Sequence, residues 1–267
     1  MTLFDSHAHY NDDRFGSDAE RESRIREIMD GGVKYIVNAG TTHKTSLQSL
    51  KIAEGIDGFY ASVGIHPSDL YDLSDPYTAL AEIEALASHP KAVAIGEIGL
   101  DYYWHEERHD FQKEFFHLQL EMAERLGLPV IVHDRDAHGD SLEVVSSHKN
   151  ARGVFHSYSG SAETAAELVK LGWYISFSGV VTFKNATRLA EIVPTIPEDR
   201  LLVETDCPYL TPHPHRGKRN DSSYMSLTVE RIAELRGDTP EHIAEITLSN
   251  AAKLFKKCGI REHTKNN

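Results

Sequence analysis

Apolar residues along this 267-residue chain gather into short runs that recur at regular intervals. Each run is almost continuously apolar, which is typical of parallel strands that helices cover on both faces. The strands predicted from these runs are Thr2–Asp5, Val33–Asn38, Phe59–Val63, Ala92–Gly96, Pro129–Val132, Gly153–Phe155, Tyr174–Phe177 and Leu201–Glu204.

Amphipathic helical patterns separate the runs. Ser17 and Glu20 have capping-box spacing, which predicts the start of the first helix. Thr239 before Pro240 predicts the start of the last helix. In a central helix, apolar residues three or four positions apart form one stripe, made of Phe111, Phe115, Leu118, Met122 and Leu126. The buried side predicted for the last helix comprises Ile243, Ile246, Leu254 and Phe255.

Eight strands that alternate with helices predict an α/β fold, namely a TIM-type (β/α)8 barrel. The length of the chain allows either one large barrel or two small domains. The unbroken alternation favours a single barrel domain over residues 1–267. Catalytic residues of such barrels lie at the C-terminal ends of the strands, so we expect the site there.

Side chains that can bind metals lie at the ends of five of the predicted strands: His7 and His9, Glu97, His133, His156, and Glu204 with Asp206. Residues two apart in an extended segment point to the same side, so His7 and His9 present both imidazoles to one ion. Two solvated surface histidines are the alternative for that pair alone. Burying Glu97 among Ile and Gly residues is costly unless a cation pairs with it. Glu204 faces the same side as Asp206, either to orient a ligand or to contact substrate.

Four imidazoles and two carboxylates exceed the needs of one tetrahedral ion. They suit two divalent ions that share a bridging carboxylate and a bridging water, an arrangement that favours hydrolysis by a metal-activated water. The nitrogen-rich set suits Zn, Mn, Co or Ni better than Mg, which prefers oxygen ligands.

The net charge of −13 argues against broad binding of duplex DNA, which requires a basic face. No apolar run approaches the roughly 18–20 residues of a membrane span. The start of the chain lacks a secretory signal pattern, and two cysteines are too few for a disulfide framework. We therefore expect a cytoplasmic protein with no membrane or obligate protein partner. Cys207 is either a nucleophile or a buried packing thiol, and packing is favoured.

In combination, several motifs resemble those of the TatD-like metal-dependent deoxyribonucleases, within the amidohydrolase-type metal barrels. The motifs are His7-Ala-His9, Gly-Ile-His66-Pro, Gly-Glu97-Ile-Gly-Leu-Asp-Tyr-Tyr, His133-Asp-Arg, His156-Ser-Tyr-Ser-Gly and Glu204-Thr-Asp206-Cys-Pro-Tyr. The resemblance extends from His7 to Tyr224.

The resemblance implies that His7, His9, Glu97 and Asp206 hold one ion, and that Glu97, as a bridging ligand, holds the second ion with His133 and His156. It further implies that His66 contacts a substrate phosphate. Asp206 would also take the proton of the attacking water, so Asp206 and Glu97 are the expected catalytic residues. The implied activity is a 3′–5′ exonuclease that acts on DNA ends.

Three features depart from the usual pattern of that family. Tyr158 replaces a common Phe, and Asp221-Ser222 stands where Glu-Pro is expected, which leaves the shape of that loop open. No lysine matches the bridging carbamate of other amidohydrolase-type enzymes, so Glu97 is expected to bridge.

A local cluster of basic residues follows the last strand: His213, His215, Arg216, Lys218 and Arg219. It is either a solvated loop or a site that positions a phosphate backbone, and we expect Arg216 to contact substrate. Tyr102, Tyr103 and Trp104 follow Glu97 and either line the barrel mouth or stack on an unpaired base, with Tyr103 as the expected contact. An acidic molecule with one basic loop favours single-stranded or frayed DNA ends.

Two other functions fit the same ligands. An amidohydrolase-type enzyme could cleave a small ester, lactone or phosphate ester, because fold does not fix the substrate. A metal-containing protein that binds DNA ends without turnover is the non-enzymatic alternative, and the intact ligand set argues against it.

Overall fold

The computed structural model describes residues 1–104 and 108–260, and within these residues eight strands form one parallel sheet in sequence order. The strands are β1 Leu3–Ala8, β2 Val33–Ala39, β3 Phe59–Val63, β4 Ala92–Asp101, β5 Val130–Arg135, β6 Gly153–Phe155, β7 Tyr174–Phe177 and β8 Leu201–Val203. The helices are α1 Asp18–Asp30, α2 His43–Glu54, α3 Pro76–Ala87, α4 His109–Leu126, α5 His138–Ser147, α6 Ala162–Lys170, α7 Thr187–Ile192, α8 Met225–Arg236 and α9 Pro240–Leu254.

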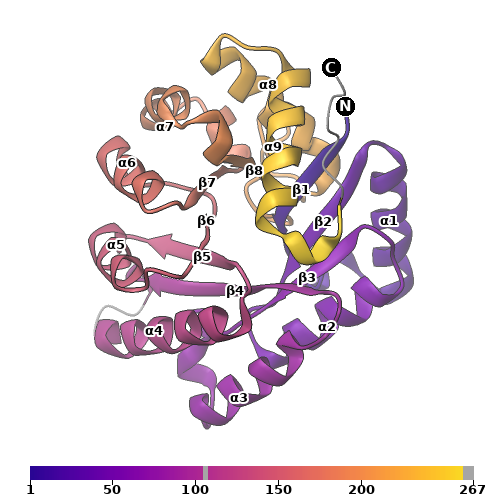
Figure 1. The fold of residues 1–267 in the computed structure, drawn as a ribbon. Coiled ribbons are helices and arrows are strands. Elements are labelled where there is room, and N and C mark those ends of the chain that lie inside the picture. The colour runs from indigo at the N-terminus through magenta and orange to yellow at the C-terminus, as the bar shows by residue number, and fades with distance from the viewer. Residues whose placement is uncertain (105–107, 261–267) are drawn as a thin grey trace.

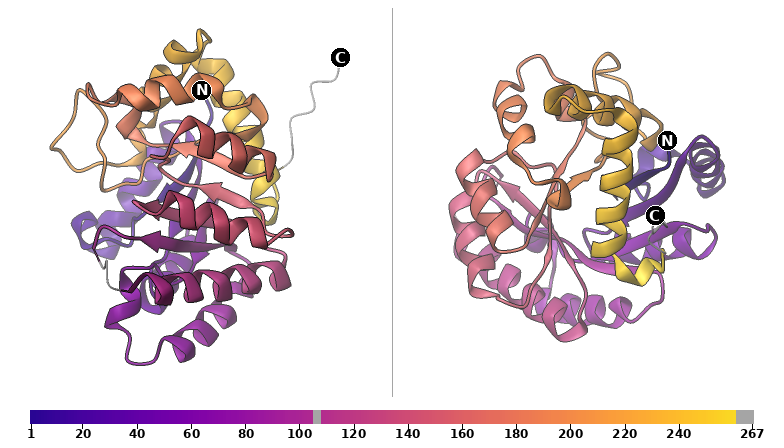
Figure 2. Two further views of the ribbon diagram at one scale, coloured as in Figure 1. Left: turned by 90° about the vertical axis from the view of Figure 1, so that its left-hand side faces the viewer. Right: turned by 45° about the horizontal axis from the view of Figure 1, so that its top comes forward.

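The sheet nearly closes into a barrel, because the end of β1 pairs with the segment that follows β8. Ala8 pairs in parallel with Cys207, and the His9 amide donates to the Cys207 carbonyl at 2.7 Å. Helices surround the strands, and α4, α5 and α6 pack side by side in chain order along the outside (Figures 1 and 2). The predicted (β/α)8 barrel is therefore confirmed.

Local sequence signals place the helix ends. Ser17 and Glu20 form the predicted capping box at the start of α1, and the Thr239 side chain accepts a hydrogen bond from the His242 amide at the start of α9. The predicted stripe on α4 is confirmed from Phe111 to Met122, but Leu126 is wrong. Leu126 is the last residue of α4 and 39% exposed, because the helix ends there at Gly127 in a left-handed conformation.

Helix α9 closes the end of the barrel opposite the strand termini that carry the predicted ligands. Its last turn packs against inward-facing residues near the starts of the strands, including Phe4, Val93 and Leu202. Phe255 stacks on Phe4 with ring centroids 5.8 Å apart. In Figure 1, α9 runs beside β1 and β8, which it also contacts.

Four strand ends near the site differ from the prediction. β1 continues to Ala8 and β5 to Arg135, so His7 and His133 lie within strands and not after them. β4 continues from Gly96 to Asp101, because its later residues pair with His133, Asp134 and Arg135 of β5. β8 ends at Val203, before Glu204. Among the described helices, none is long and apolar enough to cross a membrane.

Candidate metal centre

His7 and His9 face each other at the C-terminal end of β1. Their Nε2 atoms are 2.9 Å apart, and both side chains are buried or nearly so. The Nδ1 atom of His9 lies 3.2 Å from the Ala39 carbonyl oxygen. Since only a protonated Nδ1 can donate to that carbonyl, the hydrogen bond leaves the Nε2 lone pair of His9 free for a cation.

Glu97 of β4 lies at the middle of the cluster. Its Oε2 atom is 3.3 Å from His7 Nε2 and 3.4 Å from His9 Nε2. Its Oε1 atom is 2.7 Å from His133 Nδ1 and 2.9 Å from His156 Nε2. The two oxygens of one buried carboxylate thus face two separate pairs of imidazoles.

The remaining ring nitrogens of His133 and His156 each meet a second carboxylate. His133 Nε2 is 3.0 Å from Asp101 Oδ2, and His156 Nδ1 is 3.2 Å from Glu204 Oε1. Such pairs fix the orientation of a histidine that binds a metal and make its other nitrogen more basic. The sequence allowed Glu204 either to orient a metal ligand or to contact substrate. Because its side chain is fully buried, its position supports the first of these roles.

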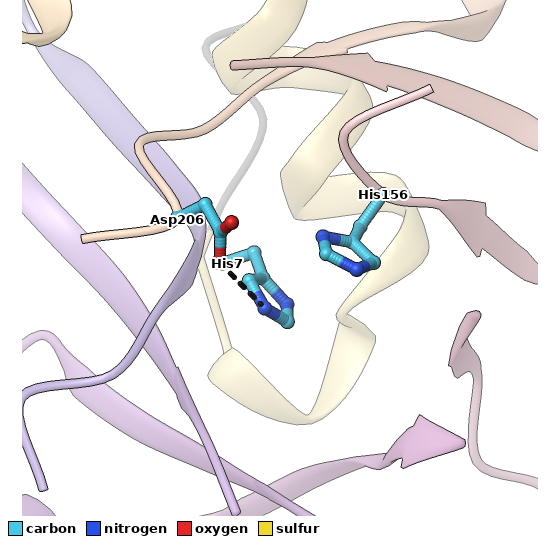
Figure 3. Close-up of side chains that lie close together, drawn as sticks. All are labelled: His7, His156 and Asp206. Atoms are coloured by element: carbon cyan, nitrogen blue, oxygen red, sulfur yellow. Dashed lines mark ion pairs between the residues drawn. The ribbon is translucent and has the colours of Figure 1, made fainter. Parts of the chain in front are cut away.

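Asp206 completes the group from the segment after β8. Its Oδ1 atom lies 3.3 Å from His9 Nε2 and 3.6 Å from His7 Nε2. Figure 3 shows the Asp206 carboxylate beside His7, with the His156 ring next to the His7 ring; the two ring centroids are 4.0 Å apart. The structure thus brings all six predicted ligands together: His7, His9, Glu97, His133, His156 and Asp206.

The arrangement suits divalent cations on grounds of charge. Burial opposes a charge on His133, but the hydrogen bonds that its ring donates to Asp101 and Glu97 raise its pKa to about 9. Burial also opposes a charge on His156. The negative charges of Glu97 and Glu204 outweigh this effect, so the pKa of His156 lies well above its ordinary value. In the metal-free protein, protons on these rings therefore supply the positive charge that the carboxylates require.

His7 differs from those two rings. Burial lowers its pKa, which keeps the ring neutral, and its Nδ1 atom is buried without a hydrogen-bond partner among the described residues. Three overlapping sets of ligand atoms lie within 4.8 Å of one another: His7, His9 and Glu97; His7, His156 and Asp206; and His66, Glu97 and His133. Imidazole nitrogens and carboxylate oxygens that converge in this way are suitable donors for a transition metal, which displaces protons from the charged rings when it binds.

A cavity of about 800 Å³ opens over these residues. Its described lining residues are His9, Asn11, Asp12, Asp13, Thr41, Lys44, Thr45, Gln48, His66, Ser68, Asp69, Glu97, Asp101, Trp104, His133, Arg135, His156, Asp206 and Tyr209. His66, the expected phosphate contact, lies in the wall of this cavity. Its Nε2 atom is 3.5 Å from Glu97 Oε1.

The expected contacts Arg216 and Tyr103 are outside the described lining of this cavity, although the Tyr103 ring lies beside Arg135, which lines it. Arg216 is not among the described lining residues, and its guanidinium packs over the Phe183 ring at 3.7 Å. Tyr102 stacks on His109 and donates its hydroxyl proton to Asp140. Trp104 lines the cavity, whereas Tyr103 contacts Trp104 edge to face.

Cavity residues that the sequence did not mark include Asp101, Lys44 and Arg135. Arg135 had a usable signal, because it lies two positions beyond His133 on the same strand and so shares its side. Lys44 lies in the first turn of α2 and has no comparable signal. Cys207 is fully buried, and burial raises its thiol pKa, which favours packing over nucleophilic chemistry.

Known proteins match this chain over nearly its whole length. The uncharacterized metal-dependent hydrolase YabD of Bacillus subtilis is 44% identical over 256 residues, covering 95% of this chain and 99% of that protein. The 3'-5' ssDNA/RNA exonuclease TatD of Salmonella typhimurium is 33% identical over 264 residues, covering 95% and 99% of the two chains. The crystal structure of YjjV, a TatD homolog from Escherichia coli K12, has a TM-score of 0.88 at 29% identity, covering 95% of this chain and 98% of that one.

The model of one protein family matches residues 4–256, a range that contains the barrel and all six predicted ligands. The sequence match, the shared fold and the converging ligands agree. The chain therefore belongs to the TatD-related DNases, a family of metal-dependent hydrolases.

Proposed function

We propose that this chain is a phosphodiesterase that uses two divalent metal ions to remove nucleotides from the 3′ ends of single-stranded or frayed DNA. The observation that carries the proposal is the position of Glu97, whose oxygens face two separate pairs of imidazoles. A carboxylate so placed can bridge two ions. The name of the Salmonella typhimurium relative supports a single-stranded nucleic acid as substrate.

When bound, the ions supply charge that stabilises the transition state and lowers the pKa of water at the site. Asp206 lies at the edge of the cavity and takes the proton of the attacking water. His66 accepts a hydrogen bond at Nδ1 from the Ser68 amide, so its Nε2 carries the proton and can donate to a phosphate oxygen.

A second candidate is hydrolysis of a small ester, lactone or phosphate ester by the same residues. The cavity wall favours it in one respect, because Asp12, Asp13 and Asp69 place additional carboxylates around the opening. These carboxylates repel a long polyanion more than they repel a small neutral substrate.

The two candidates separate in one assay. The protein is stripped of metal, reconstituted separately with Mg, Mn or Zn, and incubated with 3′-labelled single-stranded DNA and with a panel of lactones and esters. We expect stepwise release of nucleotides, with a loss of about 10²–10⁴-fold in kcat for Asp206→Asn, because that variant lacks the proton acceptor. His133→Ala should lose metal as well as activity.

His242→Ala is the matched control. His242 pairs with Asp238 in a partly exposed acidic group outside the cavity lining, so its loss should leave nuclease activity intact. Rapid turnover of a lactone or ester with DNA left intact would transfer the assignment to the second candidate. Binding of labelled DNA with no turnover of any substrate would instead indicate a protein that binds DNA ends.

A further inference from the structure

Arg135 brings a positive charge to the wall of the candidate site, and no carboxylate in the described part of the chain pairs with it. It is the last residue of β5, and it lines the cavity together with His133. Among the described residues, its guanidinium contacts two aromatic rings and makes no ion pair or hydrogen bond. Within that part of the chain, all five N–H donors of this planar group are open to a ligand.

Two aromatic rings hold this guanidinium in place. Its central carbon lies 4.0 Å from the centroid of the Tyr103 ring and 5.7 Å from that of Trp104. The rings are perpendicular, at an interplanar angle of 86°. Cation–π contacts restrain the side chain without using its hydrogen-bond donors, so less conformational entropy is lost when a ligand binds.

The same cavity offers a contrast. Arg14 also lies over a tyrosine of the wall, with its guanidinium 4.1 Å from the Tyr209 ring centroid. Two of its donors are occupied, because Nε and Nη2 each bind the Asp12 carboxylate at 2.8 Å. The two guanidinium groups lie at similar distances from their tyrosine rings, but within the described residues Arg14 is paired with a carboxylate and Arg135 is not.

We infer that Arg135 binds the phosphate next to the one that is cleaved, and that it thereby selects an oligonucleotide over an isolated phosphodiester. This inference rests on the proposed function. Arg135 lies two residues beyond His133, about 6.6 Å farther along the strand, so it reaches outward from the metal ligands. A guanidinium binds two oxygens of one phosphate at once, a geometry that lysine cannot reproduce. Tyr103 and Trp104 act as positioning residues for this group.

The test compares two substrates in the same metal: a short single-stranded deoxyoligonucleotide and bis(p-nitrophenyl) phosphate, a diester with no neighbouring phosphate. For Arg135→Gln we expect the ratio of kcat/KM for the oligonucleotide to kcat/KM for the small diester to fall about 10- to 100-fold, mostly through KM. Arg135→Lys should recover part of the ratio, since it restores the charge without the planar group.

A second readout is the salt dependence of binding, measured with fluorescent oligonucleotide and the inactive Asp206→Asn protein. Adding Arg135→Gln should make the slope of log affinity against log salt shallower by about 0.7, the value for one phosphate contact on a single strand. Arg14→Gln is the control and should change neither the ratio nor the slope.

Equal losses on both substrates, or an unchanged ratio, would overturn the role of Arg135 while the nuclease assignment stands. Wild-type protein that cleaves neither substrate would remove the proposed function and this inference with it. The two failures are therefore distinguishable.

Discussion

His133 and His156 each have a carboxylate behind the ring, on the edge that faces away from Glu97. Asp101 serves His133 and Glu204 serves His156. In each of these pairs, the carboxylate and the histidine come from the ends of different strands. The arrangement of the strands in the barrel therefore sets the orientation of both imidazole rings. We propose that these acids tune metal affinity without binding the metal.

This role predicts the behaviour of Asp101→Asn and Glu204→Gln. Each amide keeps the size of the side chain but removes its charge, so the metal affinity should fall about 10- to 100-fold while the fold is retained. The measurement is a chelator competition assay monitored by metal content, with circular dichroism as the check on folding. An affinity equal to that of the wild type would show that these acids serve only packing.

At the scale of elements, the site depends on how closely β4 and β5 approach each other. Gly99 has a φ of 137° and pairs with His133; a Cβ atom on Gly99 would lie 2.0 Å from the His133 carbonyl oxygen. Glycine is thus required there by both conformation and space. The ligand His133 stays in position because its neighbour across the ladder has no side chain.

Gly99→Ala should therefore displace β5 and damage the metal centre along with the barrel. We expect a loss of stability of about 2–4 kcal/mol, since overpacking and backbone strain add, together with weaker metal binding. Denaturant unfolding and chelator competition measure the two effects. Gly139→Ala is the control, because a Cβ atom there meets nothing within 4 Å. If Gly99→Ala kept the stability and the metal affinity of the wild type, the site would not depend on the close approach of β4 and β5.

For the molecule as a whole, the sequence revealed the barrel and its six converging ligands, because both are encoded locally. A buried strand followed by a polar residue is visible in one dimension. Which residues meet across strands is not: Asp101 reaches His133 only through the register of β4 with β5. Arg216 shows the converse, since the sequence displays its charge but not the Phe183 ring on which it packs.

Metal binding should stabilise the whole barrel, and the gain should increase with pH. The pKa of His133 is raised from 6.5 to about 9, so its proton stabilises the metal-free fold below pH 6.5 and this contribution is lost as the pH rises through 9. Over the same interval, metal competes with fewer protons for the ring.

At 100 times the dissociation constant the gain is about 2.7 kcal/mol, or roughly 5–10 °C in Tm. Differential scanning calorimetry with and without Zn at pH 6.5 and 8.5 measures it. His133→Ala should lose most of the gain at both values. A Tm shift that is the same at both pH values in the wild type would contradict the linkage to His133.

The closure of the barrel by α9 has a consequence for how a strand is processed. Because Phe255 and its neighbours fill the end of the barrel away from the ligands, the cavity over the ligands does not continue through the barrel to that end. Under the proposed function, a DNA end enters and the released nucleotide leaves by the same opening. Each product must therefore depart before the strand can advance, which favours a distributive enzyme that trims short ends over one that threads long strands.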